Sequence, residues 1–274
     1  MPIEQNAFTT QSTGAQYVNP EFWSDKLVKK EKERTFLETF ANKDYRALGK
    51  NVTSIKIPKN SYIEASAITE GQEIPVSEVN YGSVEVTFNW YGAAFQVTLQ
   101  ELQSSFEFVM EDLVDRLSYA LAAKKEKVIA NTLISGAGVT HQKTNDLLSD
   151  IIDLQKKMRD YSVVPKYLIV STDYEAALKK VLIENGSIIL QEGLAEYDGV
   201  KIGRLLGMDV YSSAFLPSGT VLMLAEGAFV VAYQQEAKLQ KGAPNARSLW
   251  IDFAAFEAYG VAVLDDKKVG KLTN

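Results

Sequence analysis

The sequence predicts an α+β fold that is built around one long helix, and three observations carry this prediction. The run VTLQELQSSFEFVMEDLVDRLSYALAAKKEKVIANTLI at residues 97–134 contains no glycine or proline and repeats apolar residues at helical spacing. Residues 52–60 and 83–98 alternate apolar and polar side chains, which is typical of strands. Residues 147–225 alternate helix-like and strand-like segments, which indicates a mixed sheet covered by helices.

The N-terminal region is predicted to form an arm that is followed by a helix. Residues 1–18 are polar and small, with little to bury, and this favours a flexible or extended segment. Asn19 has a suitable side chain for a helix cap, and Pro20 suits the first helical position. The segment that follows offers apolar anchors at Trp23, Leu27, Phe36, Leu37 and Phe40.

The two alternating segments at 52–60 and 83–98 are predicted to be the legs of a hairpin. Residues 60–82, NSYIEASAITEGQEIPVSEVNYG, lie between them and contain too few apolar residues to form a core. Such long loops in compact domains are usually functional, and an isolated hairpin of two strands is marginal in water. We therefore expect this arm to lie on another surface.

The long helical run carries two overlapping capping boxes. Thr98 with Glu101 and Ser104 with Glu107 each fit the pattern, so the sequence predicts a short helix that ends near Ser104 and a long one that starts there. The long helix rises by about 45 Å at about 1.5 Å per residue. Its predicted core positions are Phe106, Leu113, Leu117 and Leu121, and they are expected to face the strands that close the chain.

The second half of the chain reads as further helices and strands. SGAG at residues 135–138 ends the long helix. Beyond residue 225 the segments FVVAYQQEAKL, SLWIDFAAFEAYGVAVL and KKVGKLT are predicted to be mostly antiparallel strands. Helices are expected at LLSDIIDLQKKMRDY and TDYEAALKKVL, and buried strands at PKYLIVST and TVLMLA.

Composition excludes several classes of protein. The chain has 274 residues, 46% of them hydrophobic, which is enough for a substantial core. Its net charge of −6 and the lack of cysteine argue against tight nucleic-acid binding, disulfides and thiol chemistry. The basic segment 26–34 is interpreted as a solvated helix face. No apolar run of spanning length and no signal peptide are found, so we expect a protein that is retained inside a cell or an assembly made there.

The search for catalytic motifs is mostly negative. His141 is the one histidine and is predicted to lie in a surface loop, so neither a catalytic triad nor a histidine metal site has enough residues. No phosphate-binding glycine motif occurs. Asp252 and Glu257 could pair as acid and base, which leaves a soluble carboxylate-dependent enzyme with a dimerisation arm as a remote alternative. We expect no cofactor, no metal and no catalytic site.

The order of these parts resembles the major capsid protein family of tailed phages, which has the Hong Kong 97 fold. EGQEIPVSEVNYGSVEVTFNWYGAAFQVTLQEL looks like the extended loop of that family running into its peripheral domain. PKYLIVSTDYEAAL and GVKIGRLLGMDVYSSAFLPSGTVLML look like its axial domain, and SLWIDFAAFEAYGVAVLDDKKV is similar to its closing strands. The resemblance covers nearly the whole chain and rests on order, without a catalytic signature.

The resemblance implies five segments. They are an N-terminal arm (1–49), an extended loop (50–92), a peripheral domain with a spine helix (93–142), an axial domain (143–226) and peripheral closing strands (227–274). Contacts with neighbouring subunits are expected from the arm at Phe22, Trp23 and Phe36. They are also expected from the tip of the extended loop, at Ile68, Glu70, Gly71, Gln72 and Ile74.

The implied function is a structural shell subunit of a virion. Copies of the chain would form hexamers and pentamers of an icosahedral head that encloses double-stranded DNA, assembled in the host cytoplasm without a membrane. The prototype of the family carries a scaffolding segment ahead of the arm, whereas this sequence begins almost directly at the arm. Scaffolding is therefore expected from a separate protein, the alternative being a sequence that is already trimmed, and Met1 favours the former. A portal protein is a further implied partner. The prototype of the family cross-links a lysine to an asparagine with help from a glutamate. Lys56, Lys59, Asn245 and Glu257 supply these residue types, but no local pattern selects them, and cross-linking is not predicted.

An encapsulin, a protein nanocompartment of the same fold with an enzyme cargo, is the closest alternative. The segments YVNPEFWSDKL and FANKDYRALGKN resemble a phage arm more than a helix that docks cargo. Protected DNA inside purified particles would favour the phage capsid, and an enzyme cargo in shells free of DNA would favour the encapsulin.

Overall fold

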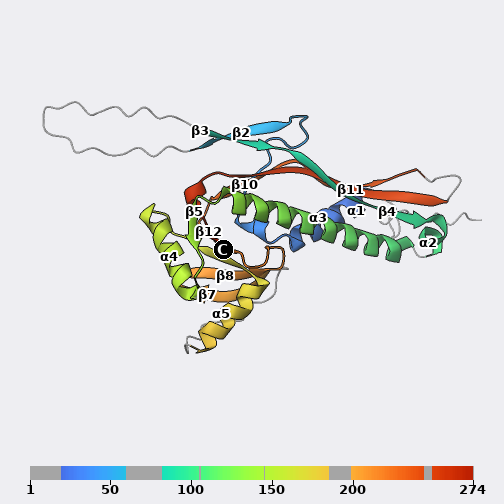
Figure 1. Cartoon of the computed structure of the whole chain (residues 1–274). Coiled ribbons are helices and arrows are strands. Elements are labelled where there is room, and N and C mark those ends of the chain that lie inside the picture. Colours follow the sequence, from blue (N-terminus) through green and yellow to red (C-terminus); the bar gives the residue numbers. More distant parts are fainter. Residues whose placement is uncertain are drawn as a thin grey trace, which may run out of the picture.

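The computed structural model describes residues 20–59, 82–104, 106–144, 146–184, 199–243 and 249–273. Within these ranges the strands form sheets of four, six and two strands (Figure 1). Helix α3 (Phe106–Gly136) is 31 residues long and lies between the four-stranded and the six-stranded sheet. The mixture of helices and sheets agrees with the predicted α+β class. None of the described helices is long and apolar enough to cross a membrane.

The four-stranded sheet has the order β1-β10-β11-β4. Strand β1 runs parallel to β10, and the other neighbours are antiparallel. The bounds of its strands are β1 (Asn42–Asp44), β10 (Phe229–Lys241), β11 (Trp250–Val263) and β4 (Asn89–Thr98). Strands β10 and β11 are the long antiparallel pair that was predicted near the end of the chain.

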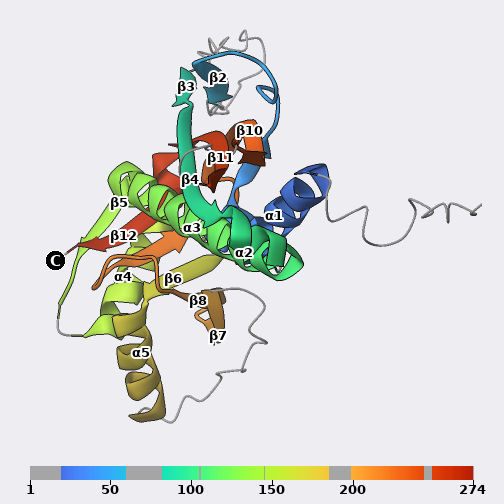
Figure 2. The ribbon, with the colours of Figure 1, turned by 90° about the vertical axis from the view of Figure 1, so that its right-hand side faces the viewer.

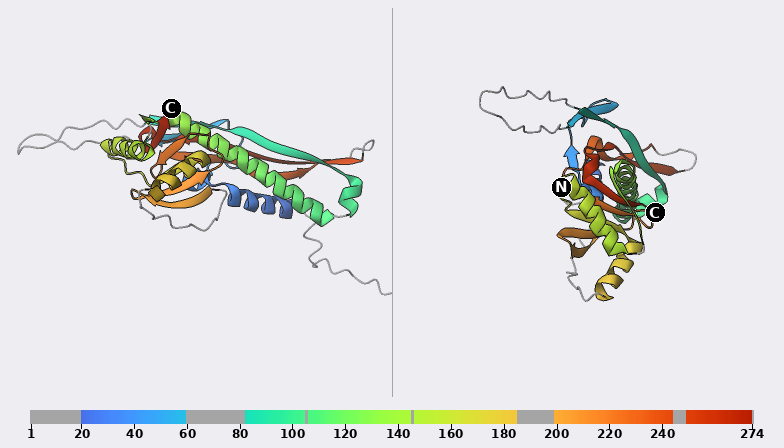
Figure 3. Two further views of the ribbon diagram at one scale, coloured as in Figure 1. Left: turned by 60° about the horizontal axis from the view of Figure 1, so that its bottom comes forward. Right: turned by 60° about the vertical axis from the view of Figure 1, so that its left-hand side comes forward.

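Helix α3 lies along one face of this sheet (Figure 3). The short helix α2 (Leu99–Ser104) precedes it, so the predicted break near Ser104 is present. The capping box at the start of α2 also forms. The backbone N–H of Thr98 donates to Glu101 Oε2 at 3.2 Å, and the N–H of Glu101 donates to Thr98 Oγ1 at 3.2 Å.

The apolar side of α3 packs against the sheet and against α1. Leu113, Leu117 and Leu121 are buried here, as expected from their spacing. The sheet and α1 contribute the following apolar residues to the same cluster: Trp23, Leu27, Val97, Ala237, Leu239, Ile251, Phe253 and Ala255. The side chain of Phe106, the fourth predicted core residue, lies outside the described part of the structure.

Helix α1 (Pro20–Arg34) lies beside α3 and β10 and is followed by the 3-10 helix η2 (Leu37–Phe40). Three cations of its basic segment pair with α3, so the segment is only in part the solvated face that we predicted. Lys30 Nζ lies 2.9 Å from Asp115 Oδ1, Arg34 Nη2 lies 2.8 Å from the same oxygen, and Lys26 pairs with Glu111. The cations of α1 thus match the acidic residues at the start of α3.

The predicted hairpin legs pair as expected. Strand β2 (Ser54–Lys59) is antiparallel to β3 (Gly82–Thr87), with Ile55 opposite Val86 and Ile57 opposite Val84. This two-stranded ladder lies at one end of the molecule, opposite α5 (Thr172–Glu184) (Figure 2). Strand β3 leads through Phe88 directly into β4, so the ladder and the four-stranded sheet share one continuous chain segment.

A close backbone contact fixes the base of this ladder on the sheet. A Cβ atom at Gly260 of β11 would lie 2.4 Å from the carbonyl oxygen of Thr87 and 2.7 Å from Val86 Cγ1. Only glycine therefore allows β11 and β3 to approach this closely. Val86 and Phe88 are buried there against Val230 and Ala232 of β10.

The six-stranded sheet has the order β5-β12-β9-β6-β8-β7. The bounds are β5 (Val139–Gln142), β12 (Val269–Thr273), β9 (Val221–Leu224), β6 (Tyr167–Ser171), β8 (Met208–Ser213) and β7 (Gly199–Leu205). Helix α4 (Leu147–Asp160) packs on β5 and β12, and α5 packs on β6 and β8. The predicted alternation of helices and strands is therefore correct for this region.

The last strand lies in a different sheet from the one we predicted. The 3-10 helix η3 (Asp266–Lys268) separates β12 from β11, and β12 inserts between β5 and β9 of the six-stranded sheet. Helix α4 packs closely here, since a Cβ atom at Gly270 would lie 2.9 Å from Met158 Sδ and would displace that side chain. Strand alternation shows which face of a strand is buried, but it does not indicate the sheet that the strand joins.

Candidate assembly surfaces and a buried charge cluster

The residues considered for chemistry lie on strands β5 and β11. The described residues contain no group of three or more His, Cys, Asp and Glu side chains that could hold a metal ion. Asp252 and Glu257 lie on one strand at an odd separation, so Asp252 is exposed and Glu257 is buried on the opposite face. The predicted acid and base therefore do not meet.

His141 lies in strand β5 and not in a surface loop, because residues 139–142 pair with β12. Its side chain is 16% exposed, and Nε2 lies 3.5 Å from Asp150 Oδ1 and 3.9 Å from Asp153 Oδ2. Asp150 also accepts hydrogen bonds from the backbone N–H and the hydroxyl of Thr144. This arrangement holds the start of α4 on β5.

A buried charge cluster joins α1, η2, α3 and β11. The side chain of Lys125 on α3 is 1% exposed, and its Nζ pairs with Glu31 of α1. It also lies 2.9 Å from Glu257 Oε2 on β11 and 3.7 Å from Glu38 Oε2 on η2. The rings of Tyr233 and Tyr259 have centroids 5.0 and 5.2 Å from this nitrogen. One ammonium group thus binds four elements of the subunit together. We call the group of Lys125, Glu31, Glu38 and Glu257 the charge cluster.

The charges of this cluster do not balance within the core. Burial alone lowers the pKa of Lys125, but the charges of Glu257 and Glu31 raise it well above its usual value. Burial raises the pKa of Glu257 to about 7 in spite of Lys125. Burial favours a raised pKa for Glu38 as well, but Lys125 and Lys43 hold it below its usual value. The cluster therefore contains more carboxylates than the ammonium group of Lys125 can neutralise. Glu257 accordingly takes up a proton near neutral pH.

Glu126 is a second buried carboxyl group next to the charge cluster. Its Oε1 accepts hydrogen bonds from the backbone N–H groups of Phe36 at 2.7 Å and Leu37 at 2.8 Å. Its Oε2 has no hydrogen-bond partner among the described residues. Burial raises the pKa of Glu126 to about 8, so the protonated acid is the main form at neutral pH. The group holds the turn between α1 and η2 on the middle of α3.

We expect Glu126→Gln to flatten the pH dependence of stability. The folded-state pKa of about 8 lies above the ordinary value of 4.5, so the folded chain keeps a proton that the unfolded chain loses. Stability should therefore fall as pH rises between about 5 and 8, by up to about 1.4 kcal/mol per pH unit for this group. Glutamine still accepts from Phe36 and Leu37 but does not titrate. Urea unfolding across this pH range tests the prediction, and an equal slope for both proteins would contradict it.

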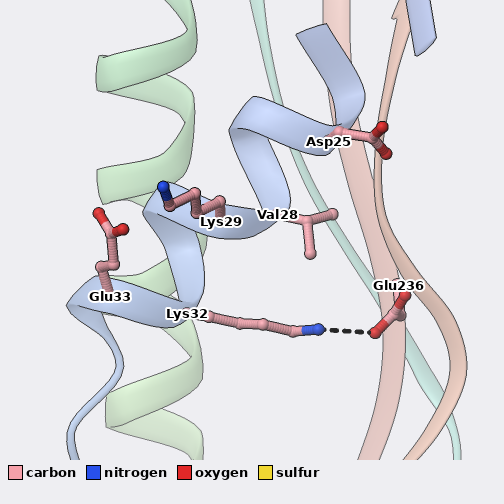
Figure 4. Close-up of a pocket in the computed structure, with 6 residues that line it drawn as sticks. All are labelled: Asp25, Val28, Lys29, Lys32, Glu33 and Glu236. Atoms are coloured by element: carbon pink, nitrogen blue, oxygen red, sulfur yellow. Dashed lines mark hydrogen bonds and ion pairs between the residues drawn. The ribbon is translucent and has the colours of Figure 1, made fainter. Parts of the chain in front are cut away.

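A groove of about 460 Å³ runs between α1 and β10 (Figure 4). The side chain of Lys32 on α1 spans the groove, and its Nζ lies 2.9 Å from Glu236 Oε1 of β10. The remaining lining is Asp25, Val28, Lys29 and Glu33. Charged side chains of both signs dominate the described lining, with Val28 as its one apolar residue.

The outer face of the four-stranded sheet carries an apolar strip. Trp90 is 61% exposed, and its ring lies 5.9 Å from the ring of Phe256 on the neighbouring strand. Gly92, Ala94 and Ala254 continue the strip on the same face, as the register of β4 and β11 requires. An exposed tryptophan in an apolar strip is a common feature of protein interfaces.

Comparison with known proteins decides the family. The family model described as "Phage capsid protein" matches residues 81–271, which is more than half of the chain. The chain belongs to the phage capsid protein family. No curated protein matches the sequence of this capsid protein.

Solved structures show the fold of the capsid protein. The virus-like particle from Pyrococcus furiosus matches with a TM-score of 0.66 at 14% identity, over 92% of this chain and 98% of that one. The capsid of cyanophage P-SCSP1u matches with a TM-score of 0.67 at 12% identity, over 87% of both chains. Mycobacterium phage Che8 matches with a TM-score of 0.66 at 17% identity, over 88% of this chain and 91% of that one. The predicted Hong Kong 97 fold is thereby confirmed.

The predicted arm residues lie at the junction of α1 and η2 with the body of the capsid protein. Trp23 is 1% exposed and Phe36 is 4% exposed, so both rings are part of the subunit's own core. Phe22 is partly buried, and its ring packs edge-on against Trp23 at 5.3 Å. The contact of these residues with a neighbouring subunit stays a prediction, for which Phe22 retains the most surface.

The predicted tip of the extended loop lies outside the described residues. This applies to Ile68, Glu70, Gly71, Gln72 and Ile74, and also to Asn245. Lys56 and Lys59 lie on β2, and Lys59 Nζ is 3.7 Å from Asp266 Oδ1. Glu257 is buried beside Lys125, so it does not face a surface lysine.

The charge cluster and the apolar strip were not identified from the sequence. Lys125 stands in the run KKEK, where three lysines look equally solvated, and only its helical phase with Leu121 places it on the buried face. Trp90 was assigned to a strand, but the alternation did not show that its face of the strand lacks a covering layer.

Proposed function

We propose that the protein is the major capsid protein of a tailed phage. Copies of the chain form hexamers and pentamers, these close into an icosahedral head, and the head encloses double-stranded DNA. The observation that carries the proposal is the family match over residues 81–271, together with a fold that is shared with phage capsids. The net charge of −6 supports a wall that confines DNA without binding it tightly.

In this proposal the two large sheets serve different parts of the shell. The four-stranded sheet with α3 forms the peripheral domain, and the six-stranded sheet with α4 and α5 faces the local symmetry axis as the axial domain. The segment 50–92 lies across a neighbouring subunit, and the arm before residue 50 reaches another. The β2–β3 ladder supports this assignment, because both of its outer edges are free of other described strands.

The partners in this proposal are further copies of the chain, a separate scaffolding protein, a portal protein and the packaged DNA. The protein acts structurally, without catalysis or a cofactor, in a virion that is assembled in the host cytoplasm. These partners follow from the role of a shell subunit in a phage head.

Electron microscopy of particles purified from the producing cells tests the proposal. We expect icosahedral shells whose DNA resists nuclease. A chain that stays monomeric or dimeric at high concentration would contradict the role of a shell subunit.

An encapsulin-type shell is the second candidate. One of the matching structures is described as a virus-like particle from Pyrococcus furiosus and not as a phage capsid, and the match covers 92% of this chain and 98% of that one. The same purification separates the two candidates. Particles that contain an enzyme and no DNA would favour the second candidate over the first.

Deletion of residues 60–80 should abolish shells and leave the subunit folded. The deletion leaves β2 and β3 intact, and it retains all the described core residues around α3 and in the six-stranded sheet. A short glycine-serine linker that joins residue 59 to residue 81 keeps the ladder closed. Circular dichroism should show an unchanged fold, and sedimentation should show only small species. Closed shells formed by this variant would show that the loop is not an intersubunit arm.

A further inference from the structure

Within the described residues, strand β4 is an edge strand of its sheet. It pairs with β11 over its whole length, from Asn89 opposite Tyr259 to Thr98 opposite Trp250. No other strand among the described residues pairs with it. Helix α3 covers the inner face of the sheet and does not occupy this edge (Figure 3). A row of backbone donors and acceptors is therefore open at the margin of the sheet.

The register shows which residues present this row. The N–H of Leu99 donates to the carbonyl of Leu249 at 2.8 Å, which marks that pair as a hydrogen-bonded one. Hydrogen-bonded and non-hydrogen-bonded pairs alternate along an antiparallel ladder. The backbone groups of Tyr91, Ala93, Phe95 and Val97 thus point to β11. Those of the alternate residues point away from it, and these residues are Trp90, Gly92, Ala94 and Gln96.

Two further hydrogen bonds agree with this assignment. The N–H of Gly242 donates to the carbonyl of Asp252 at 2.7 Å, so Asp252 directs its backbone to β10 and its neighbour Ile251 directs its backbone to β4. At the end of β4 the outward N–H of Thr98 donates to the carboxylate of Glu101. The capping box closes the row at Thr98, and the open part lies before it.

The open edge lacks the usual protection against pairing. Natural edge strands carry charged residues, proline or a bulge. The sequence NWYGAAFQVT contains no charged residue and no proline, although 23% of the chain is charged. The pairing of β4 with β11 has no register shift, whereas that of β10 with β11 has two. The side chains beside the open row are small at Gly92 and Ala94, so they do not block an incoming strand.

We propose that an extended strand of a second copy of this chain pairs with the open edge of β4, at Trp90, Gly92, Ala94 and Gln96. This inference rests on the proposed function, in which copies of the chain meet in a shell. A second copy is favoured because the chain itself supplies an extended ladder, β2–β3, whose outer edges are free of other described strands. The exposed ring of Trp90 then lies on the face that the new strand extends.

Ala94→Pro tests the proposal, since proline removes only the outward N–H of this residue. The bonds from β4 to β11 remain, and proline is tolerated on edge strands where the N–H faces solvent. Ala94→Ser is the matched control, because it changes the same side chain and keeps the N–H. We expect the wild type and Ala94→Ser to form shells and Ala94→Pro to need at least about tenfold more protein for assembly. Shell formation by Ala94→Pro at the wild-type concentration would overturn the proposal.

Hydrogen exchange of the wild type provides a second measurement that needs no folded variant. Peptides covering residues 89–98 should be protected at least about tenfold more in shells than in dissociated subunits. Equal exchange in both states overturns the proposal and leaves the proposed function intact. Protection that appears only after another protein is added overturns the assignment of a second copy. A wild-type chain that never assembles overturns both this inference and the proposed function.

Discussion

Lys125→Met should destabilise the subunit by about 3 to 5 kcal/mol, because it leaves the buried carboxylates of Glu31 and Glu257 without their nearest cation. The methionine side chain fills a similar volume, so the loss comes from charge and not from a cavity. Glu31, Glu38 and Glu257 would share the site, and each is at most 3% exposed. Chemical unfolding followed by circular dichroism measures the change.

Two further variants separate the charge effect from the general effect of altering α3. Lys127→Met changes an exposed lysine two residues further along the same helix and should shift stability by no more than about 0.5 kcal/mol. Glu257→Gln in the Lys125→Met background removes one of the uncompensated carboxylates and should recover part of the loss, about 1 to 3 kcal/mol. Equal losses for Lys125→Met and Lys127→Met would show that the cluster does not stabilise the subunit.

Leu117→Asp should destabilise the subunit by about 2 to 5 kcal/mol, since it removes buried apolar contacts and places a carboxylate in the core. Leu117 is 0% exposed and lies among residues of α1, β10 and β11. The aspartate would have to protonate or draw water into the contact between helix and sheet. The unfolding midpoint in urea measures the effect.

Ala120→Asp is the matched control for this variant, because Ala120 lies on the exposed side of α3 less than one turn away. It should lower stability only by the helix propensity difference, about 0.7 kcal/mol. A negligible shift for Leu117→Asp would mean that the buried face of α3 is assigned incorrectly.

Most of the fold follows from patterns of three to seven residues in the sequence. The break between α2 and α3 was predictable because the capping box of Thr98 and Glu101 is a local signal. The β2–β3 ladder was predictable because Ile55, Ile57, Val84 and Val86 alternate cleanly. The family was predictable from the order of these elements along the chain.

The contacts between distant segments could not be predicted in the same way. The charge cluster requires Glu31, Lys125 and Glu257 to meet, and no local pattern links residues so far apart in the sequence. The location of β12 was wrong for the same reason, since its alternation fits either sheet. The open edge of β4 was also not identifiable, because an edge strand and a central strand can share one apolar sequence.

The position of β12 also determines the order in which the subunit can fold during synthesis. Among the six strands of its sheet, β5 leaves the ribosome first and β12 leaves it last. In the described structure β5 pairs with β12 alone. The sheet therefore cannot be completed before β12 has left the ribosome, and contacts of such high sequence separation form slowly. Neighbouring nascent chains on one messenger RNA thus remain unable to present a finished sheet to each other until β12 of each chain has been synthesised.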